Sequence, residues 1–241
     1  MKKHSGVLLV ILLVIIIIGG CALKDRLLKK ETPKQITNSL QLFLKFDASS
    51  IEDLSDYHNL ISKQGSFNFT EDYNRFDGKT TFIEIGKDFN KNQALSIGFW
   101  IKPVKRQSGF ILANGPVQNT PSLLVFFDSF KRVKLNRGKS SEYSSQDSVP
   151  FNKWTHVFIT SDGSNAVFYI NGIKQNEFIQ ETIVNANHTK TYIGKGFECS
   201  TIAGSFRCSD TYFDGYLDDL RVYNQVLSSD EIQKIYEETK K

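Results

Sequence analysis

Asp218 and Asp219 are the acidic residues of this chain that come closest to a catalytic arrangement, because they stand side by side in its last strongly apolar segment. Cleavage of a glycosidic bond needs two carboxyl groups held roughly 5 to 9.5 Å apart. Neighbouring side chains of a β-strand point to opposite faces. If residues 215–223 form a strand, we expect these two carboxylates to be unable to act together on one bond.

Histidine suggests no other catalytic chemistry. His156 could serve as a base, but no serine or cysteine nucleophile stands in a recognisable elbow. His4, His58 and His188 are isolated in the sequence and indicate neither a set of metal ligands nor a triad. We therefore interpret His156 as a packing residue, and we expect that the protein is not an enzyme.

The three cysteines divide into Cys21, at the end of an apolar leader, and a close pair, Cys199 and Cys208. Zinc sites usually bring in their ligands as closely spaced pairs, and no histidine pair accompanies these residues. A disulfide between Cys199 and Cys208 is the favoured interpretation, because the leader indicates an oxidising compartment. Two unrelated free thiols are the alternative.

The first 23 residues predict export. Lys2 and Lys3 precede an unbroken apolar run over residues 7–18, which is the layout of a signal peptide. The sequence Ile-Gly-Gly-Cys at residues 18–21 also resembles the lipobox of bacterial lipoproteins, which implies lipidation of Cys21. The alternative is an uncleaved anchor, because residues 6–23 are free of charge and reach the ~18 residues of a spanning helix. Both interpretations place the protein outside the cytoplasm and tether it to a membrane, with residues 24–38 as a polar tether.

Short apolar segments separated by turn signals fill residues 39–241 and predict one all-β domain. Phe occurs 19 times and Tyr 9 times, whereas Met occurs once, a bias that suits half-buried pleated surfaces. We expect strands over residues 40–46, 80–85, 95–102, 109–113, 123–128, 132–136, 155–161, 166–170, 192–194 and 215–223. Many short strands without interleaved helices are typical of an antiparallel two-sheet β-sandwich or jelly roll.

Two local signals refine this prediction. Asn171-Gly172 stands between two apolar runs and predicts a tight hairpin, because a type I′ turn needs positive φ at both central residues. Ser228 and Glu231 form a capping box in front of an amphipathic segment, which predicts a short helix near the C-terminus.

Seven short motifs follow one another in a characteristic order. They are Leu-Lys-Phe-Asp at 44–47, Phe-Asp-Gly at 76–78, Phe-Ile-Glu-Ile at 82–85, Phe-Trp-Ile-Lys-Pro at 99–103, Trp-Thr-His-Val at 154–157, Tyr-Ile-Asn-Gly at 169–172 and Phe-Asp-Gly-Tyr-Leu-Asp-Asp-Leu-Arg-Val-Tyr-Asn at 213–224. Each motif is weak alone, but together they resemble the LamG-like jellyroll domain of the concanavalin A-like lectin and glucanase superfamily. The resemblance spans residues 40 to 236 and implies a jelly-roll sandwich.

The two tryptophans and three aspartates carry further expectations. We interpret Trp100 and Trp154 as core residues on facing sheets, and stacking on a sugar ring is the alternative. Related sandwiches hold a structural Ca²⁺ through an aspartate of the last strand, so the resemblance implies Asp218 as a ligand. Asp77 and Asp47 are the implied helpers. Alternatively, Asp218 pairs with Arg221 or caps a turn.

Ligand binding is expected in loops, because binding residues are concentrated on loops carried by a rigid scaffold. Residues 196–210 are predicted to be such a loop, with Phe197, Phe206 and Arg207 as candidates for stacking on sugar rings. A lid over a sheet edge is the other interpretation of this segment.

We predict from these residues a non-catalytic recognition module that binds a glycan or a protein at the cell envelope. A structural or adhesive envelope module without a small ligand is one alternative, and a diverged glycan-active enzyme is another. The net charge is only +4 and the basic residues are spread through the chain, so no nucleic-acid partner is expected.

Overall fold

The computed structural model describes residues 38–46, 50–67, 73–115, 122–138, 141–181, 183 and 188–241. The predicted leader with Cys21, the predicted tether up to residue 37 and Asp47 lie outside these ranges. Residues Ser39–Lys241 form one compact unit. Within the described ranges, no helix has the length and apolar character needed to cross a membrane.

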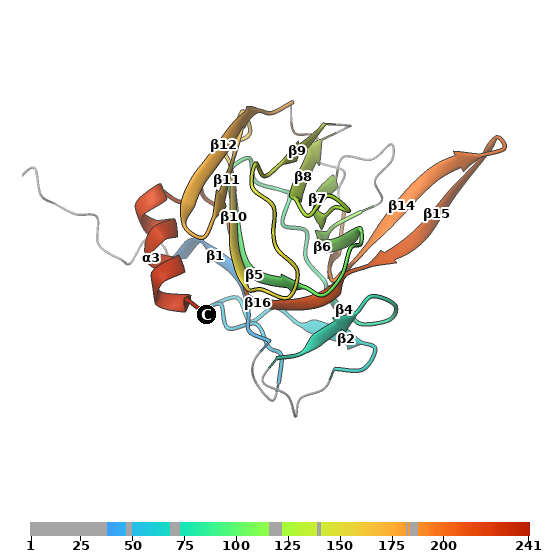
Figure 1. Cartoon of the computed structure of the whole chain (residues 1–241), viewed down its shortest axis with the longest axis horizontal. Helices are drawn as coiled ribbons and strands as arrows, with labels where there is room; N and C mark the ends of the chain where they lie inside the picture. Colours follow the sequence, from blue (N-terminus) through green and yellow to red (C-terminus); the bar gives the residue numbers. More distant parts are fainter. Residues whose placement is uncertain are drawn as a thin grey trace, which may run out of the picture. The chain divides into compact units, whose positions relative to one another are not determined.

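Two antiparallel sheets build this unit (Figure 1). Among the described residues, the first sheet has the order β1(Leu40–Leu44), β16(Asp214–Tyr223), β5(Leu95–Pro103), β10(Thr155–Ser161), β11(Asn165–Ile170) and β12(Ile173–Ile179), with β3(Arg75–Asp77) also paired to β16. The second has the order β2(Ile61–Gln64), β4(Phe82–Ile85), β13(Thr191–Ile193), β6(Gly109–Ala113), β7(Ser122–Phe127), β8(Val133–Gly138) and β9(Glu142–Ser144). The predicted jelly-roll sandwich is confirmed.

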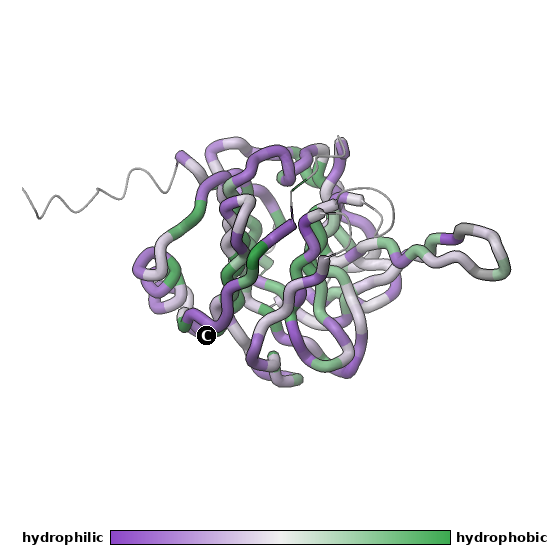
Figure 2. Tube along the Cα trace, turned by 90° about the horizontal axis from the view of Figure 1, so that it is seen from above, coloured by the Kyte–Doolittle hydropathy of each residue, from purple (hydrophilic) through white to green (hydrophobic). Residues whose placement is uncertain are grey.

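One hydrophobic core lies between the two sheets. Alternate residues of β5, among them Ile97, Phe99 and Ile101, face this core together with Ile111 and Val125 of the second sheet. Figure 2 shows apolar residues that recur along the chain in the body of the sandwich, with more polar residues between them. Because the side-chain period of a strand is two, the residues between them face away from the core.

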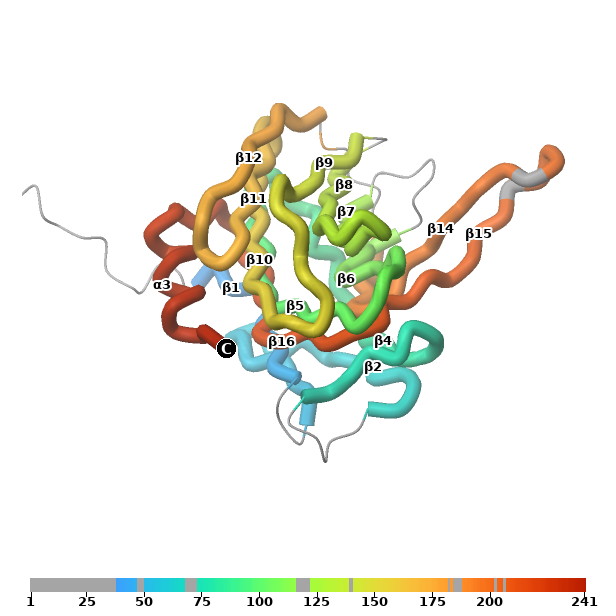
Figure 3. The backbone as a smooth tube through the Cα atoms, viewed as in Figure 1, coloured from blue at the N-terminus to red at the C-terminus, as the bar shows by residue number. Residues whose placement is uncertain are grey.

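Two predicted local features are confirmed. Asn171 and Gly172 join β11 to β12, and both have positive φ, 50° and 77°. The helix α3(Ser229–Thr239) begins at Ser228, whose hydroxyl accepts a hydrogen bond from the Glu231 backbone N–H. Figure 3 shows the chain leaving β16, forming α3 beside the first sheet and ending next to β16.

Residues 195–212 differ from the expectation of a loop. They form a hairpin of two strands, β14(Lys195–Ile202) and β15(Ser205–Tyr212), that is a sheet of its own and extends beyond the sandwich (Figures 1 and 3). Among the described side chains of its outer half, Ser200, Thr201 and Arg207 are exposed and come from both faces. Without a covered face the hairpin has no apolar alternation, which is why the sequence pattern did not reveal it.

Candidate functional site

Both tryptophans belong to the first sheet and leave it on the outer side, so the prediction that they lie on facing sheets is wrong. The prediction of a buried packing residue is confirmed for Trp100, which is 2% exposed, but not for Trp154. Trp100 follows the core residue Phe99 in β5, so its side chain leaves the sheet on the opposite side. Trp154 stands directly before β10, in the same sheet, and is only partly buried. Neither indole belongs to the core between the sheets.

Helix α3 covers Trp100. The indole is 2% exposed, and its ring lies 5.8 Å from the ring of Tyr236 in the helix. Its Nε1–H donates a 2.9 Å hydrogen bond to Oγ1 of Thr239. A buried indole with a satisfied N–H is a packing residue, so Trp100 attaches the helix to the sheet.

Trp154 lies instead in a partly exposed group of aromatic rings from three separate segments. Its ring is 4.9 Å from that of Tyr73 and 6.3 Å from that of Tyr216 in β16. We call these three residues, with the ammonium groups of Lys102 and Lys241, the Trp154 cluster. The cluster lies beside the region that α3 covers, because Lys102 and Trp100 are both outward residues of β5.

Turns and strand register hold this cluster in place. Asn152 has a φ of 58° and its N–H donates to the Pro103 carbonyl, so the turn before Trp154 is fixed against the end of β5. Asn74 binds the Phe46 carbonyl through both its backbone and its side-chain nitrogen, which fixes the neighbouring Tyr73. Tyr216 is paired in register with Lys102 across two strands.

Two cations line the aromatic rings. The Nζ atom of Lys102 lies 5.0 Å from the Tyr216 ring centre and 5.8 Å from that of Trp154. Lys241 Nζ lies 4.8 Å from the ring of Tyr73 and 5.3 Å from that of Trp154. Ammonium groups at such distances are attracted by the ring quadrupoles. The arrangement offers apolar ring surface next to hydrogen-bond donors with positive charge.

A laminin G-type family model, described as the concanavalin A-like lectin/glucanases superfamily, matches residues 77–233. The chain belongs to this superfamily. The match covers the strands β4 to β16, which include those that carry Lys102 and Tyr216 of the Trp154 cluster, and it includes Trp154 itself. No curated protein matches the sequence.

Solved structures of the same fold include botulinum neurotoxin binding domains. The serotype C1 binding domain is 18% identical with a TM-score of 0.64, and the alignment covers 85% of this chain and 53% of that one. The binding domain of the DC toxin in complex with SialylT is 17% identical with a TM-score of 0.64, covering 84% and 52%. A type C toxin structure that concerns two ganglioside molecules is 17% identical with a TM-score of 0.63, covering 86% and 53%. This chain thus spans about half the length of the toxin binding domains that share its fold.

The side chains of Asp218 and Asp219 in β16 do not alternate between the two faces of the sheet as expected. The register of β16 against β5 shifts between Asp218 and Arg221, and Asp219 has a φ of 49°. This bulge breaks the period of two, so the prediction of opposite faces is wrong. Both carboxylates are buried and both interact with Lys241.

Cations neutralise these two carboxylates. Asp218 accepts hydrogen bonds from the Phe46 N–H at 2.8 Å and from Lys241 Nζ at 2.5 Å. Asp219 lies 3.3 Å from the Arg221 guanidinium and 4.0 Å from Lys45 Nζ. Burial raises the pKa of Asp219 above its usual range, although Arg221 opposes the shift. The predicted pairing with Arg221 is therefore made by Asp219, and Asp218 pairs with Lys241.

The carboxylates of Asp77 and Asp218, two of the three residues implied for calcium, are already occupied by hydrogen-bond donors. Oδ1 of Asp77 accepts hydrogen bonds from the backbone N–H groups of Lys79, Thr80 and Thr81, and Oδ2 accepts one from the Thr80 hydroxyl. Burial opposes it, but these hydrogen bonds hold the pKa of Asp77 far below its usual range. Asp77 thus stabilises a turn, and the carboxylate of Asp218 is paired with the ammonium group of Lys241.

Calcium binding stays a prediction that these contacts do not support. Within the described ranges, no three His, Cys, Asp or Glu side chains come together as a metal site. Asp47, the third implied ligand, lies outside those ranges. The donor atoms that surround Asp77 and Asp218 are N–H and O–H groups, which compete with a cation for the carboxylate oxygens.

The three residues predicted to bind a ligand in segment 196–210 are spread along the hairpin. Phe197 lies at its base, opposite Asp210, whereas Arg207 lies opposite Ser200 and is exposed. Phe206 is paired with Thr201 nearer the tip, and its side chain lies outside the described part. Three register positions separate Phe197 from Arg207, about 10 Å along a strand, so these residues do not form one site.

Phe197 belongs to a second aromatic group, which the sequence did not indicate. Lys195 Nζ binds Asp210 at 2.8 Å and lies between 4.7 and 5.8 Å from four aromatic rings. We call this group the Lys195 cluster; its rings are those of Phe82, Tyr192, Phe197 and Tyr212. The cluster joins the base of the hairpin to the outer face of the second sheet.

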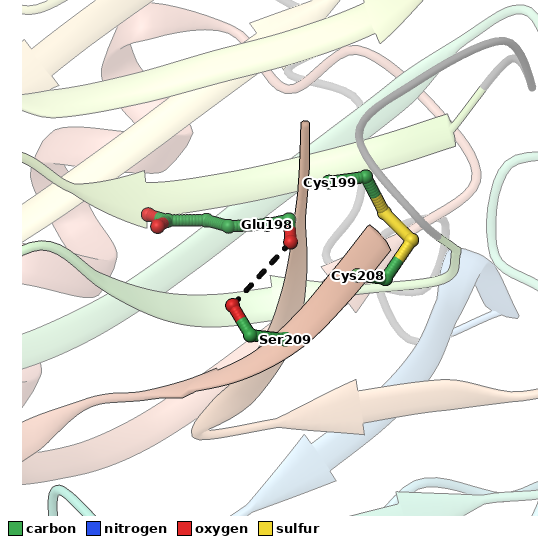
Figure 4. Close-up of a disulfide and its surroundings, with 4 residues drawn as sticks. All are labelled: Glu198, Cys199, Cys208 and Ser209. Carbon is green, nitrogen blue, oxygen red and sulfur yellow. Dashed lines mark hydrogen bonds between the residues drawn. A yellow bond between two sulfur atoms is a disulfide. The ribbon is translucent and has the colours of Figure 1, made fainter. Parts of the chain in front are cut away.

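The predicted disulfide is confirmed. Cys199 and Cys208 stand directly opposite each other on β14 and β15, with their sulfur atoms 2.03 Å apart (Figure 4). Beside it, the Ser209 hydroxyl donates to the Glu198 carbonyl at 3.5 Å. The bond links the two strands of the hairpin at mid-length.

His156 is a packing residue, as predicted. It is 1% exposed and lies under α3, with its ring 5.1 Å from Trp100 and 5.7 Å from Tyr236. Burial, with a smaller contribution from the positive charge of Arg221, lowers the pKa of His156 to about 3. The imidazole is therefore neutral at physiological pH and is shielded from any substrate in solution.

Proposed function

We propose that the protein is a non-catalytic, extracytoplasmic recognition module that binds a glycan through the Trp154 cluster. The observation that carries this proposal is the placement of Trp154, which lies outside the core and is partly exposed among two tyrosines and two ammonium groups. The C–H face of a sugar ring packs well on an aromatic ring, and lysines donate hydrogen bonds to its hydroxyl groups.

The charge of the cluster favours glycans with acidic sugars. Lys102 lies against the rings and Arg75 is paired in register with Tyr216, whereas the charge of Lys241 is neutralised by Asp218. Arg75 binds Asp214 at 2.7 Å, but its side chain is 48% exposed. A carboxylate on the sugar would gain from these positive groups, and salt would screen part of that gain.

The described carboxylates and His156 support a role without catalysis. Asp218 and Asp219 lie near each other, but both are buried and held by Lys241, Arg221 and backbone groups. A glycosidase needs a carboxylic acid and a second carboxylate that reach the scissile bond. These two residues do not have that access.

The location proposed for the module follows from its leader and its disulfide. Disulfides persist in oxidising compartments outside the cytoplasm, and Cys199 and Cys208 form one. We propose that the N-terminal segment tethers the module to the membrane, through lipid on Cys21 or as an uncleaved anchor. Mass spectrometry of the membrane-extracted protein distinguishes the two, since only the lipoprotein starts at a modified Cys21.

The toxin structures of similar fold add support of a limited kind. One of these structures concerns interaction with two ganglioside molecules and another is a complex with SialylT, and a glycan is the ligand class that we propose for this chain. At 17% identity and about half of their length, the likeness concerns the fold. The choice of ligand rests on the Trp154 cluster.

Glycan-array binding with a matched set of variants tests the proposal. Trp154→Ala and Tyr216→Ala should each abolish or strongly weaken binding, because the few aromatic rings at the centre of a binding site contribute most of the binding free energy. Phe130→Ala is the control, because Phe130 is a 68% exposed ring on the β7–β8 turn. Binding that survives Trp154→Ala but is lost in Phe197→Ala would move the site to the Lys195 cluster. Any bound glycan should be recovered intact, and its cleavage would contradict the non-catalytic role.

A further inference from the structure

A cavity of about 180 Å³ opens at the end of the first sheet that lies away from the Trp154 cluster. Its walls come from β1, from the segment between β4 and β5, and from the end of β16, and include Gln41, Lys87, Lys91 and Tyr223. The volume corresponds to about six water molecules at roughly 30 Å³ each. Leu95 at the cavity and Lys102 in the Trp154 cluster are at opposite ends of β5, roughly 23 Å apart at 3.3 Å per residue.

An unpartnered donor lies in the wall of this cavity. Gln41 is 8% exposed, and its Oε1 accepts a 3.1 Å hydrogen bond from Lys87 Nζ, which fixes the orientation of the amide. Its Nε2 is buried and has no hydrogen-bond acceptor among the described residues. A buried amide donor without an acceptor is costly, so a ligand that brings an acceptor would be favoured.

Lys87 is held in place beside this donor. Its Nζ lies 4.1 Å from the ring centre of Tyr57 and 5.3 Å from that of Phe89. Desolvation lowers the pKa of Lys87, although the charge of Asp53 opposes the shift. A desolvated ammonium group interacts strongly with a negative ligand group, because water screens the pair less.

A buried arginine makes the opposite wall rigid. Arg137 is 1% exposed, and its guanidinium donates to Oδ1 of Asn90 at 2.9 Å, to the Gln93 carbonyl at 2.6 Å and to the Asn92 carbonyl. These bonds clamp the segment that contributes Asn92 to the cavity. A wall fixed before the ligand arrives reduces the entropy lost on binding.

Lys87 contributes positive charge to the cavity wall, which Asp88 also lines. Asp88 Oδ1 already accepts hydrogen bonds from the Asn90 N–H at 2.8 Å and from Nδ2 of Asn114 at 2.6 Å. The ligand that complements such a wall is small, carries a negative charge and has further hydrogen-bonding groups.

We infer that this cavity binds a small hydroxylated carboxylate, of the size of a single sugar acid, with its carboxylate at Gln41 and Lys87. The site is separate from the Trp154 cluster and uses none of its residues. The inference therefore does not depend on the proposed glycan platform, and either can fail without the other.

Isothermal titration with glucuronate, glucose and acetate tests this inference on the folded protein. Glucuronate should bind saturably and more tightly than glucose or acetate, and added salt should weaken it. Gln41→Leu and Lys87→Met should each reduce the affinity about tenfold or more, the loss expected when one hydrogen bond to a charged group is removed. Thermal unfolding checks that each of the two variants is folded, and a folded variant of either kind is enough for the test.

Gln64→Leu is the control, because Gln64 is an exposed glutamine on β2. Trp154→Ala should keep wild-type affinity for glucuronate. Equal binding of glucose and glucuronate would overturn the inference, and so would binding that survives both cavity variants. Loss of glucuronate binding in Trp154→Ala alone would place the acid at the Trp154 cluster instead.

Discussion

Trp100 and Trp154 occupy the same outer face of the same sheet, yet their surroundings differ in one respect. Helix α3 covers Trp100 and gives its indole N–H an acceptor in Thr239. Within the described ranges no helix contacts Trp154, whose ring lies near two tyrosines and two lysines. What separates a packing tryptophan from a candidate binding tryptophan here is the element laid over it.

The first and largest test of this comparison is stability. Trp100→Ala should lower the free energy of unfolding by about 3 to 5 kcal/mol, the usual cost of removing a fully buried aromatic side chain. Trp154→Ala should cost only about 1 kcal/mol, because that ring is partly exposed and loses two ring contacts. Urea unfolding followed by circular dichroism, with the disulfide intact, measures both values. Equal losses would show that Trp154 is a packing residue as well.

The second test uses pH, because His156 lies under the same helix as Trp100. Its pKa is about 3 in the folded protein and 6.5 in the unfolded chain. Between these values the unfolded chain binds the proton and the folded protein does not, so stability falls as the pH falls from about 6.5 towards 3. At 1.36 kcal/mol per pKa unit, the loss between pH 7 and pH 4.5 is about 2 to 3 kcal/mol.

His156→Phe should remove this part of the acid sensitivity. Unfolding of the wild type and the variant is compared at the two pH values, so that contributions from aspartates common to both cancel. His58→Asn is the control, since His58 is exposed with a φ of 43°, which asparagine tolerates. An unchanged pH dependence in His156→Phe would mean that the helix does not shield the imidazole.

The sequence predicted most of the sandwich, because strands with one covered face alternate with a period of two. It did not reveal the hairpin β14–β15 or the edge strand β12, where both faces carry exposed polar residues. Where neither face of a strand is covered, apolar and polar residues need not alternate, so the sequence shows no strand pattern. Cys199 and Cys208 were the signal that remained, and their pairing was predicted correctly.

The placement of the tryptophans could not be predicted for a different reason. In β5 both faces are apolar, with Phe99 towards the core and Trp100 towards α3, so alternation gives two faces without saying which one is the core. The bulge at Asp218 and Asp219 likewise leaves no mark in the sequence. The Trp154 cluster joins residues 73, 154 and 216, which only the fold brings together.

The smallest test isolates the bond that distinguishes the two indoles. Thr239→Val keeps the shape of the side chain but removes the Oγ1 that accepts from Trp100 Nε1–H and donates to the Ile235 carbonyl. The expected loss of stability is about 1 kcal/mol. Ser228→Ala, which weakens the helix cap by about the same amount, leaves the indole bond untouched and is the control.

The chain has only two tryptophans, so each indole N–H gives its own NMR signal. In the wild type, hydrogen exchange should be slow at Trp100 and fast at Trp154, because α3 shields only the first. Thr239→Val should accelerate exchange at Trp100 more than Ser228→Ala does, since the second variant loosens the start of the helix while Thr239 stands at its end. Equal acceleration would mean that the indole is protected by the helix as a whole, and that the hydrogen bond adds nothing of its own.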